Sequence, residues 1–139
     1  MGQWDNKRIV LGVTGSIAAY KAVSLLRFLV GEGADVSVVM TNAARQFVTP
    51  LTFEVLSKNA VNDELFSGKA PMPHLKLTEN ADLMLVAPAT ANTLAKSALG
   101  LADDLLSTMI LAARCPIIMA AAMDGELWED RKASSRSRG

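Results

Sequence analysis

The chain contains four short, mainly apolar segments, each close to turn-forming or helix-capping residues. Apolar runs without polar alternation are typical of strands that are covered on both faces of a parallel sheet. We predict strands at residues 8–13, 35–40, 83–87 and 117–121, with Pro88 ending the third. More than a dozen residues separate the first two strands, so we expect them to run parallel through a right-handed crossover.

Between these segments, apolar residues recur at the spacing of helices. We predict helices at residues 17–29, at about 42–56 with a division at Pro50, and at 93–113 with a break near Gly100. Asp103 and Asp104 follow that break and would stabilise a new helix start by opposing its dipole. The stretch 57–73 has weak periodicity and is predicted to be mainly connection.

This alternation of strand and helix predicts one domain with an open, doubly wound α/β sheet. Ligands of such sheets bind beyond the carboxyl ends of the strands. The segments expected at that edge are residues 14–17, 41–42, 88–93 and 122–128.

Composition narrows the class of protein further. The 139 residues suit a single domain, and 14 basic residues balance 14 acidic ones, which argues against a nucleic-acid partner. Cys115 is the one cysteine and His74 the one histidine, so neither a Cys-rich zinc site nor a histidine metal cluster is expected. The chain has no run of about 18 apolar residues and no apolar secretion signal at residues 1–7, so we expect a cytoplasmic protein without a membrane partner.

The glycine-containing segment GVTGSIAAYK, residues 12–21, lies where the first strand meets the first helix. Backbone amides at such a helix start can hold a phosphate, and Gly15 permits close approach. The segment matches neither the P-loop nor the three-glycine dinucleotide fingerprint. Asp35 also opens the second strand, whereas an acid that contacts a ribose should close it. The pattern fits a phosphate-bearing ligand and an ordinary tight turn equally well.

Small and hydroxyl-bearing residues form the segment PATANT, residues 88–93, after the third strand. This composition would leave room for a flat ligand, and Asn92 can both donate and accept hydrogen bonds. Alternatively, Thr90 or Asn92 is simply a helix N-cap. His74 lies between Pro73 and apolar residues, a position that suits a structural role as well as a catalytic one.

Taken in order, four segments resemble the homo-oligomeric flavin-containing cysteine decarboxylases. The segments are GVTGSIAAYK, VVMTNAARQFVTPLTFEVLS, HLKLTENADLMLVAPATANTLAKSALGLADDLLS and AAAMDGELWE. The resemblance implies an FMN-binding Rossmann-like or flavodoxin-like domain with three αβα layers. It also implies assembly into trimers, often into dodecamers, with each flavin at a contact between subunits.

The resemblance assigns site residues by motif. The positions expected to contact FMN are Gly15, Ser16, Ile17, Thr41, Phe47, Thr90, Ala91, Asn92, Ser107 and Met123. His74 matches the active-site histidine of the family, which assists proton removal during substrate oxidation. Asp124 stands where the family has an asparagine that binds the substrate carboxylate.

The implied reaction is decarboxylation of 4′-phosphopantothenoylcysteine to 4′-phosphopantetheine in coenzyme A biosynthesis. In the family, FMN first oxidises the cysteinyl end to a thioaldehyde, whose C=S bond accepts the electron pair released with carbon dioxide. The reduced flavin then returns the electrons. A phosphopantothenoylcysteine synthetase, as a further domain or a separate chain, is the expected protein partner.

Two departures from the family pattern bear on this reaction. An ionised Asp124 would repel the substrate carboxylate unless it is protonated or paired with a cation. Family members also continue past Trp128 into a flap that carries a proton-donating cysteine, whereas here a basic tail follows. We therefore expect a shortened chain with an N-terminal extension at 1–7, a flavoprotein domain at 8–130 and a disordered tail at 131–139.

Two other functions remain open at this level. Asp124 and the missing flap suit a non-catalytic or regulatory FMN-binding subunit. Because the region that sets substrate specificity is missing, a flavoprotein that decarboxylates a C-terminal peptidyl cysteine is the second alternative. A prenylated-flavin synthase fits less well, because its first glycine loop usually differs from GSIAAYK.

Overall fold

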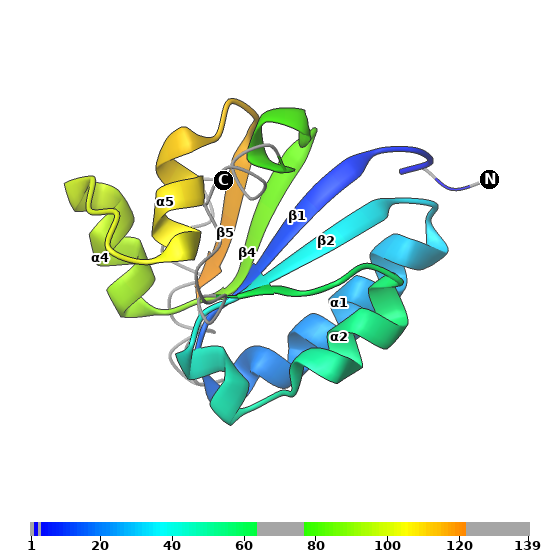
Figure 1. Cartoon of the computed structure of the whole chain (residues 1–139), viewed down its shortest axis with the longest axis horizontal. Helices are drawn as coiled ribbons and strands as arrows, with labels where there is room; N and C mark the ends of the chain where they lie inside the picture. Colours follow the sequence, from blue (N-terminus) through cyan, green and yellow to red (C-terminus); the bar gives the residue numbers. More distant parts are fainter. Residues whose placement is uncertain (1, 3, 64–76, 122–139) are drawn as a thin grey trace, which may run out of the picture.

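A five-stranded parallel sheet forms the centre of the molecule in the computed structural model, which describes residues 2, 4–63 and 77–121 (Figure 1). The strands lie in the order β3-β2-β1-β4-β5. Their bounds are Arg8–Val13 for β1, Asp35–Met40 for β2, Asn62–Asp63 for β3, Leu83–Ala89 for β4 and Ile117–Ala121 for β5. This is the Rossmann strand order, and it confirms the predicted doubly wound α/β class.

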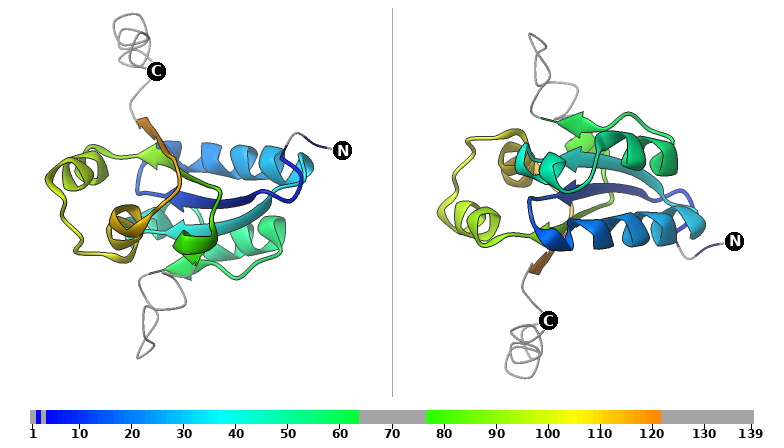
Figure 2. Two further views of the ribbon diagram at one scale, coloured as in Figure 1. Left: turned by 90° about the horizontal axis from the view of Figure 1, so that it is seen from above. Right: turned by 90° about the horizontal axis from the view of Figure 1, so that it is seen from below.

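Helices cover both faces of the sheet and make the predicted three layers. Figure 1 shows α1 and α2 on one side and α4 and α5 on the other, and Figure 2 shows α4 at the end of the sheet away from the N-terminus. The bounds are Tyr20–Gly31 for α1, Pro50–Ser57 for α2, Ala91–Leu99 for α4 and Leu105–Ala112 for α5. Short 3-10 turns, Ile17–Ala19 and Ala43–Gln46, precede α1 and α2. The predicted divisions at Pro50 and near Gly100 are confirmed.

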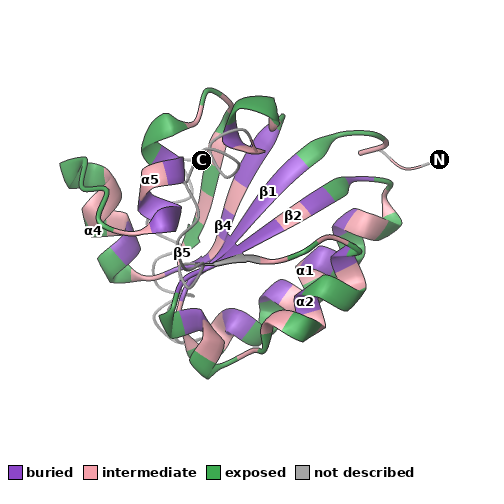
Figure 3. Cartoon of the chain, in the orientation of Figure 1, coloured by how far each residue is buried: buried purple, intermediate pink, exposed green. Residues whose placement is uncertain are grey.

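Alternate residues of the central strands supply two separate cores. Leu11, Val38 and Met40 pack toward α1 and α2 together with Leu26 and Phe53. On the opposite face, the buried side chains are Val10, Val39, Met84, Val86, Leu105, Leu106, Met109 and Ile110. Figure 3 shows β1 and β2 almost continuously buried. Each large aliphatic side chain buried in this way contributes about 1.5–3 kcal/mol, so the cores fix both helical layers on the sheet.

Two strand boundaries differ from the sequence prediction. β3 was expected to be connection, but its two residues pair with Val39 and Met40, and two residues are too few to show periodicity. Pro88 was expected to end β4, but the strand continues through a cis Ala87–Pro88 peptide to Ala89. The register against β5 shifts between Val86 and Ala89, and proline is tolerated where the ladder is irregular.

Within the described residues, no helix combines the length and the apolar character needed to cross a bilayer.

Candidate functional site

Loops that follow three neighbouring strands surround a pocket at the carboxyl edge of the sheet. β2 and β4 lie on opposite sides of β1, so the chain changes direction across the sheet between β1 and β4. Such a switch point is where doubly wound folds bind ligands. The pocket is a cavity of about 350 Å³ lined by Thr14, Gly15, Thr41, Asn42, Ala43, Thr90, Asn92, Thr93 and Asp104.

The buried side chain of Thr14 connects the ends of β1 and β4. Its hydroxyl donates a hydrogen bond to the carbonyl oxygen of Pro88 and accepts one from the Thr90 N–H at 3.1 Å. The two partners are more than 70 residues away in sequence. Thr14 therefore sets the position of the PATANT segment relative to the glycine turn.

Gly15 is the point of closest approach between the first and second loops. A Cβ atom at this position would lie 2.4 Å from the Ala43 Cβ and 2.9 Å from the Ala43 carbonyl carbon. Thr41 stabilises the same loop, because its Oγ1 accepts a hydrogen bond from the N–H of Ala44, the residue after Ala43, at 3.2 Å. The sequence predicted that Gly15 permits close approach of a phosphate; in the structure, the close approach at Gly15 is that of the loop after β2.

Thr90 begins α4 as its N-cap. Its Oγ1 accepts a hydrogen bond from the Thr93 N–H at 3.3 Å, as the capping alternative for PATANT predicts. The first amides of a helix have no carbonyl partner within the helix. The amides of Ala91 and Asn92 are therefore available for an acceptor beyond the helix end, and the capping and ligand-binding interpretations are compatible.

Asp104, which lines the pocket, is also the N-cap of α5. Its Oδ1 accepts hydrogen bonds from the Ser107 N–H at 2.7 Å and from the Ser107 hydroxyl at 2.6 Å. Its Oδ2 accepts one from Lys96 Nζ at 2.9 Å. Burial raises the pKa of the Asp104 carboxyl, but the hydrogen bonds from Ser107 and Lys96 outweigh it, so this pKa lies below its ordinary value.

The predicted site residues are only partly brought together. Gly15, Thr41, Thr90 and Asn92 line the pocket, with Ala91 beside them in the chain. Ser107 does not line it; this residue is buried, and its hydroxyl is hydrogen bonded to Asp104. Ser16 caps the following turn by accepting a hydrogen bond from the Ala18 N–H at 3.1 Å.

Two predicted flavin contacts, Ile17 and Phe47, do not line the cavity of the single chain. Their exposed fractions are 80% and 50%, which leaves large apolar side chains uncovered on the loops after β1 and β2. His74, Met123 and Asp124 lie outside the described residues.

The pocket also contains residues that were not predicted as site residues: Thr14, Asn42, Ala43, Thr93 and Asp104. Thr14, Asn42 and Thr93 lie in the strand-end segments predicted to bind a ligand. A signal for Asp104 exists in the sequence, since Asp followed three residues later by Ser has the spacing of a reciprocal cap. The bond from Thr14 to Pro88 has no local signal, because its partners are distant in the chain.

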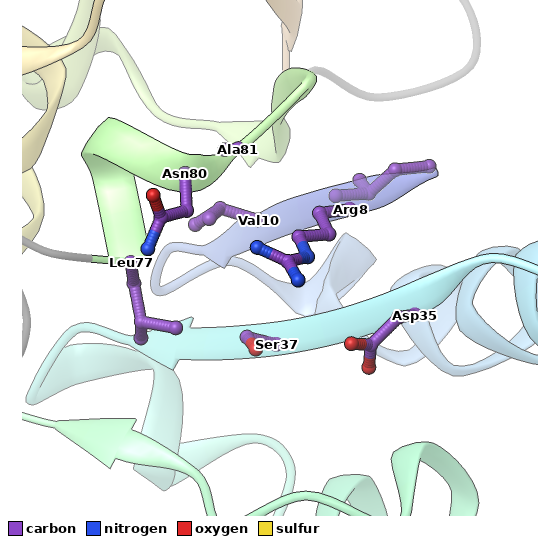
Figure 4. A pocket seen from close by; sticks show the side chains of 8 residues that line it. Arg8, Val10, Asp35, Ser37, Leu77, Asn80 and Ala81 are labelled. Atoms are coloured by element: carbon purple, nitrogen blue, oxygen red, sulfur yellow. The ribbon is translucent and has the colours of Figure 1, made fainter. Parts of the chain in front are cut away.

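A second hollow, of about 180 Å³, lies at the opposite, amino-terminal edge of the sheet. Figure 4 shows Arg8 on β1 and Asp35 on β2, with Leu77 and Asn80 facing them from the helical turn at 77–80. Asp35 is thus confirmed at the wrong edge for a ribose contact. Of the predicted site residues that the structure describes, none lines this hollow, whereas four line the switch-point pocket, which is therefore the candidate site.

The fold and the pocket define a doubly wound α/β protein whose switch-point pocket is lined by small, hydroxyl-bearing and amide-bearing residues and by one acidic residue, Asp104. The chain belongs to the Flavoprotein family, whose model matches residues 2–136. This match confirms the resemblance found in the sequence motifs.

Individual relatives are similar over nearly the whole chain. The Coenzyme A biosynthesis bifunctional protein CoaBC of Vibrio cholerae is 47% identical over 126 residues, which are 89% of this chain and 32% of that protein. CoaBC of Mycolicibacterium smegmatis is 46% identical over 138 residues, 96% of this chain and 33% of that protein. The chain therefore spans about a third of the length of these relatives.

Solved structures support the same family. The FMN-dependent cysteine decarboxylase SpaF superposes with a TM-score of 0.76 at 33% identity, covering 96% of this chain and 81% of SpaF. A PPC decarboxylase mutant complexed with pantothenoylaminoethenethiol superposes with a TM-score of 0.70 at 29% identity, covering 96% of this chain and 78% of that one.

Replacing Thr14 by valine tests how the pocket is held together. Valine keeps the shape of the side chain but leaves the Pro88 carbonyl and the Thr90 N–H without their partner, so we expect a loss of roughly 1–3 kcal/mol in unfolding free energy. Thr52→Val is the matched control, because Thr52 lies in α2 and, among the described residues, its hydroxyl is hydrogen bonded to the exposed Thr49 hydroxyl, at 3.2 Å. Urea denaturation measures both variants, and equal losses would contradict the assigned role.

Proposed function

We propose that this chain is the FMN-binding decarboxylase unit for 4′-phosphopantothenoylcysteine. The observation that carries the proposal is the switch-point pocket. In it, Gly15 of the loop after β1 lies against Ala43 of the loop after β2, and most of the other lining residues carry hydroxyl or amide groups. The similarity to bifunctional coenzyme A biosynthesis proteins supports this substrate over a peptide. The flavoprotein unit is assigned to residues 8–130, and a cytoplasmic location suits a metabolic enzyme of this kind.

The residues of the pocket fit a phosphorylated flavin. A cavity of about 350 Å³ lies in the range of small-molecule sites. Short side chains and backbone groups for the phosphate would come from Gly15, Ser16 and Thr41. The amides of Ala91 and Asn92 at the start of α4 would bind acceptors of the ligand. Bound FMN would supply a two-electron acceptor that later returns the electrons, so the net reaction releases only carbon dioxide.

We assign the remaining roles from the family motifs. His74 would remove a proton from the cysteinyl end of the substrate, and Met123 would contact the flavin. The motifs assign Ser107 a contact with the flavin, but Ser107 does not line the pocket of the single chain, so we assign it a role through Asp104, to which it is hydrogen bonded. Asp124 would face the substrate carboxylate and therefore needs a proton or a cationic partner for productive binding.

Assembly into a trimer or a dodecamer belongs to the same proposal. Ile17 and Phe47 expose apolar side chains near the pocket, and large exposed apolar groups that gather at a site are typical of interfaces. A neighbouring subunit would cover them and complete the flavin site. The synthetase activity paired with the flavoprotein would come from a further domain or from a separate chain.

Flavin uptake and product analysis test the function directly. The purified chain should be yellow with one FMN per subunit, and it should release carbon dioxide from 4′-phosphopantothenoylcysteine with a thiol or enethiol product visible by mass spectrometry. A colourless preparation that takes up no FMN would contradict the proposal.

The same assay separates the other candidate functions. A chain that binds FMN tightly but releases no carbon dioxide would be the non-catalytic subunit that Asp124 suggests. Faster turnover of a peptide ending in cysteine would instead assign the peptidyl substrate, a question raised by the similarity to SpaF.

A further inference from the structure

Among the described residues that line the pocket, Asp104 alone carries a charge, and that charge is negative. The other lining groups are neutral hydroxyl, amide and backbone groups. A flavin phosphate carries close to two negative charges near neutral pH. An uncompensated carboxylate in the same cavity would therefore oppose the ligand that the pocket is proposed to bind.

Lys96 supplies the compensating charge from α4, the helix whose first turn also lines the pocket. Its Nζ lies 2.9 Å from Asp104 Oδ2 and 2.9 Å from Asp103 Oδ1. The side chains of Lys96 and Asp104 are only 17% and 20% exposed, whereas that of Asp103 is 66% exposed. The less exposed ion pair of this network is thus the one whose acidic member, Asp104, lines the pocket.

Protonation does not readily remove the negative charge of Asp104. Its pKa is lowered despite burial, and the hydrogen bonds to Asp103 and Asp104 raise the pKa of Lys96. Both members therefore stay ionised around neutral pH. Because the carboxylate also caps α5 through Ser107, both of its oxygens are held by hydrogen bonds next to the pocket that Asp104 lines.

We propose that Lys96 is a positioning residue that holds and neutralises Asp104, and that the pair thereby sets the preference of the pocket for FMN over unphosphorylated riboflavin. This inference rests on the proposed function, namely that the pocket takes FMN. Lys96 acts through Asp104 and is not assigned a contact with the flavin. Its loss would leave the fixed carboxylate to repel the phosphate.

Affinities for FMN and for riboflavin, measured by quenching of flavin fluorescence, test the charge balance. Lys96→Met should raise the Kd for FMN by roughly tenfold, the size expected for a single charge acting on a phosphate across a partly solvated pocket. The Kd for riboflavin should rise by no more than about threefold, because riboflavin has no phosphate. High salt should reduce the effect on FMN.

A second substitution shows whether the effect passes through Asp104. In Lys96→Met/Asp104→Asn, the uncompensated charge is gone while asparagine still caps α5, so FMN affinity should return to within about threefold of the wild-type value. Lys96→Arg keeps the positive charge and should keep the FMN preference. Lys7→Met, which removes an exposed positive charge just before β1 at the other end of the sheet, is the matched control.

The outcomes separate this inference from the proposed function. Equal weakening of FMN and riboflavin by Lys96→Met would mean that Lys96 only joins α4 to α5, and it would overturn the inference. If Lys96→Met does not fold, Asp104→Asn alone decides, because it should strengthen FMN binding relative to riboflavin and an unchanged ratio would overturn the inference. A wild-type chain that binds neither flavin would overturn the proposed function, and the inference with it.

Discussion

Gly15→Ala is expected to weaken FMN binding by at least about tenfold and to lower the unfolding free energy by roughly 1–3 kcal/mol, the usual cost of overpacking. The added methyl would lie 2.4 Å from the Ala43 Cβ and 2.9 Å from its carbonyl carbon. Neither atom is the far end of a flexible side chain. Relief therefore requires the loop after β2 to move away from the loop after β1, which opens the proposed phosphate site.

Gly31→Ala is the matched control for this substitution. Gly31 ends α1, and apart from its chain neighbours and its own helix, no described residue lies within 4 Å of the position that its Cβ would take. This variant should be as stable as the wild type or more stable by up to about 1 kcal/mol. FMN titration and urea denaturation measure both variants.

A second-site change shows whether the contact with Ala43 causes the loss. Gly15→Ala/Ala43→Gly removes the Cβ–Cβ contact but keeps the contact with the carbonyl carbon, so partial recovery of FMN affinity is expected. If Gly15→Ala binds FMN as the wild type does, the two loops are not held together as described.

His74→Asn is expected to reduce carbon dioxide release from 4′-phosphopantothenoylcysteine by about a hundredfold or more, in the range found for loss of a general acid or base. Asparagine keeps hydrogen-bonding capacity but cannot take up a proton near neutral pH. Single-turnover carbon dioxide release measures the effect. FMN content should stay at the wild-type level, because His74 is assigned to the substrate.

Two outcomes would contradict this assignment. Carbon dioxide release that persists in His74→Asn would show that another group removes the proton. Loss of bound FMN together with activity would mean that His74 contributes to the flavin site instead. Gly15→Ala gives the reference pattern for flavin loss, so the two variants separate binding from chemistry.

The buried parallel strands are the elements whose bounds could be predicted best from the sequence. β1, β2 and β5 begin and end where the apolar segments predict, because strands covered on both faces show uninterrupted apolar runs. The prediction was wrong at Pro88, where a shift in register carries the strand past the proline. It also missed β3, whose two residues follow no detectable period.

The candidate site was predictable only in part. Gly15, Thr41, Thr90 and Asn92 could be placed at strand ends from the alternation of elements alone, and the pocket contains all four. Asp104 was expected to favour a helix start, which is confirmed, but its place in the pocket was not foreseen. Lys96 lies eight residues from Asp104, across a helix end, and no local spacing rule links them.

The sequence by itself determined the order of strands and helices, the glycine and hydroxyl residues at the strand ends, and membership of the flavoprotein family. Only the tertiary structure decided that β4 lies beside β1, that Thr14 bonds to Pro88, and that Lys96 compensates a carboxylate at the pocket. The physical reason is the range of the interactions. Periodicity and capping depend on neighbours within one element, whereas contacts between distant segments exist only after packing has brought those segments together.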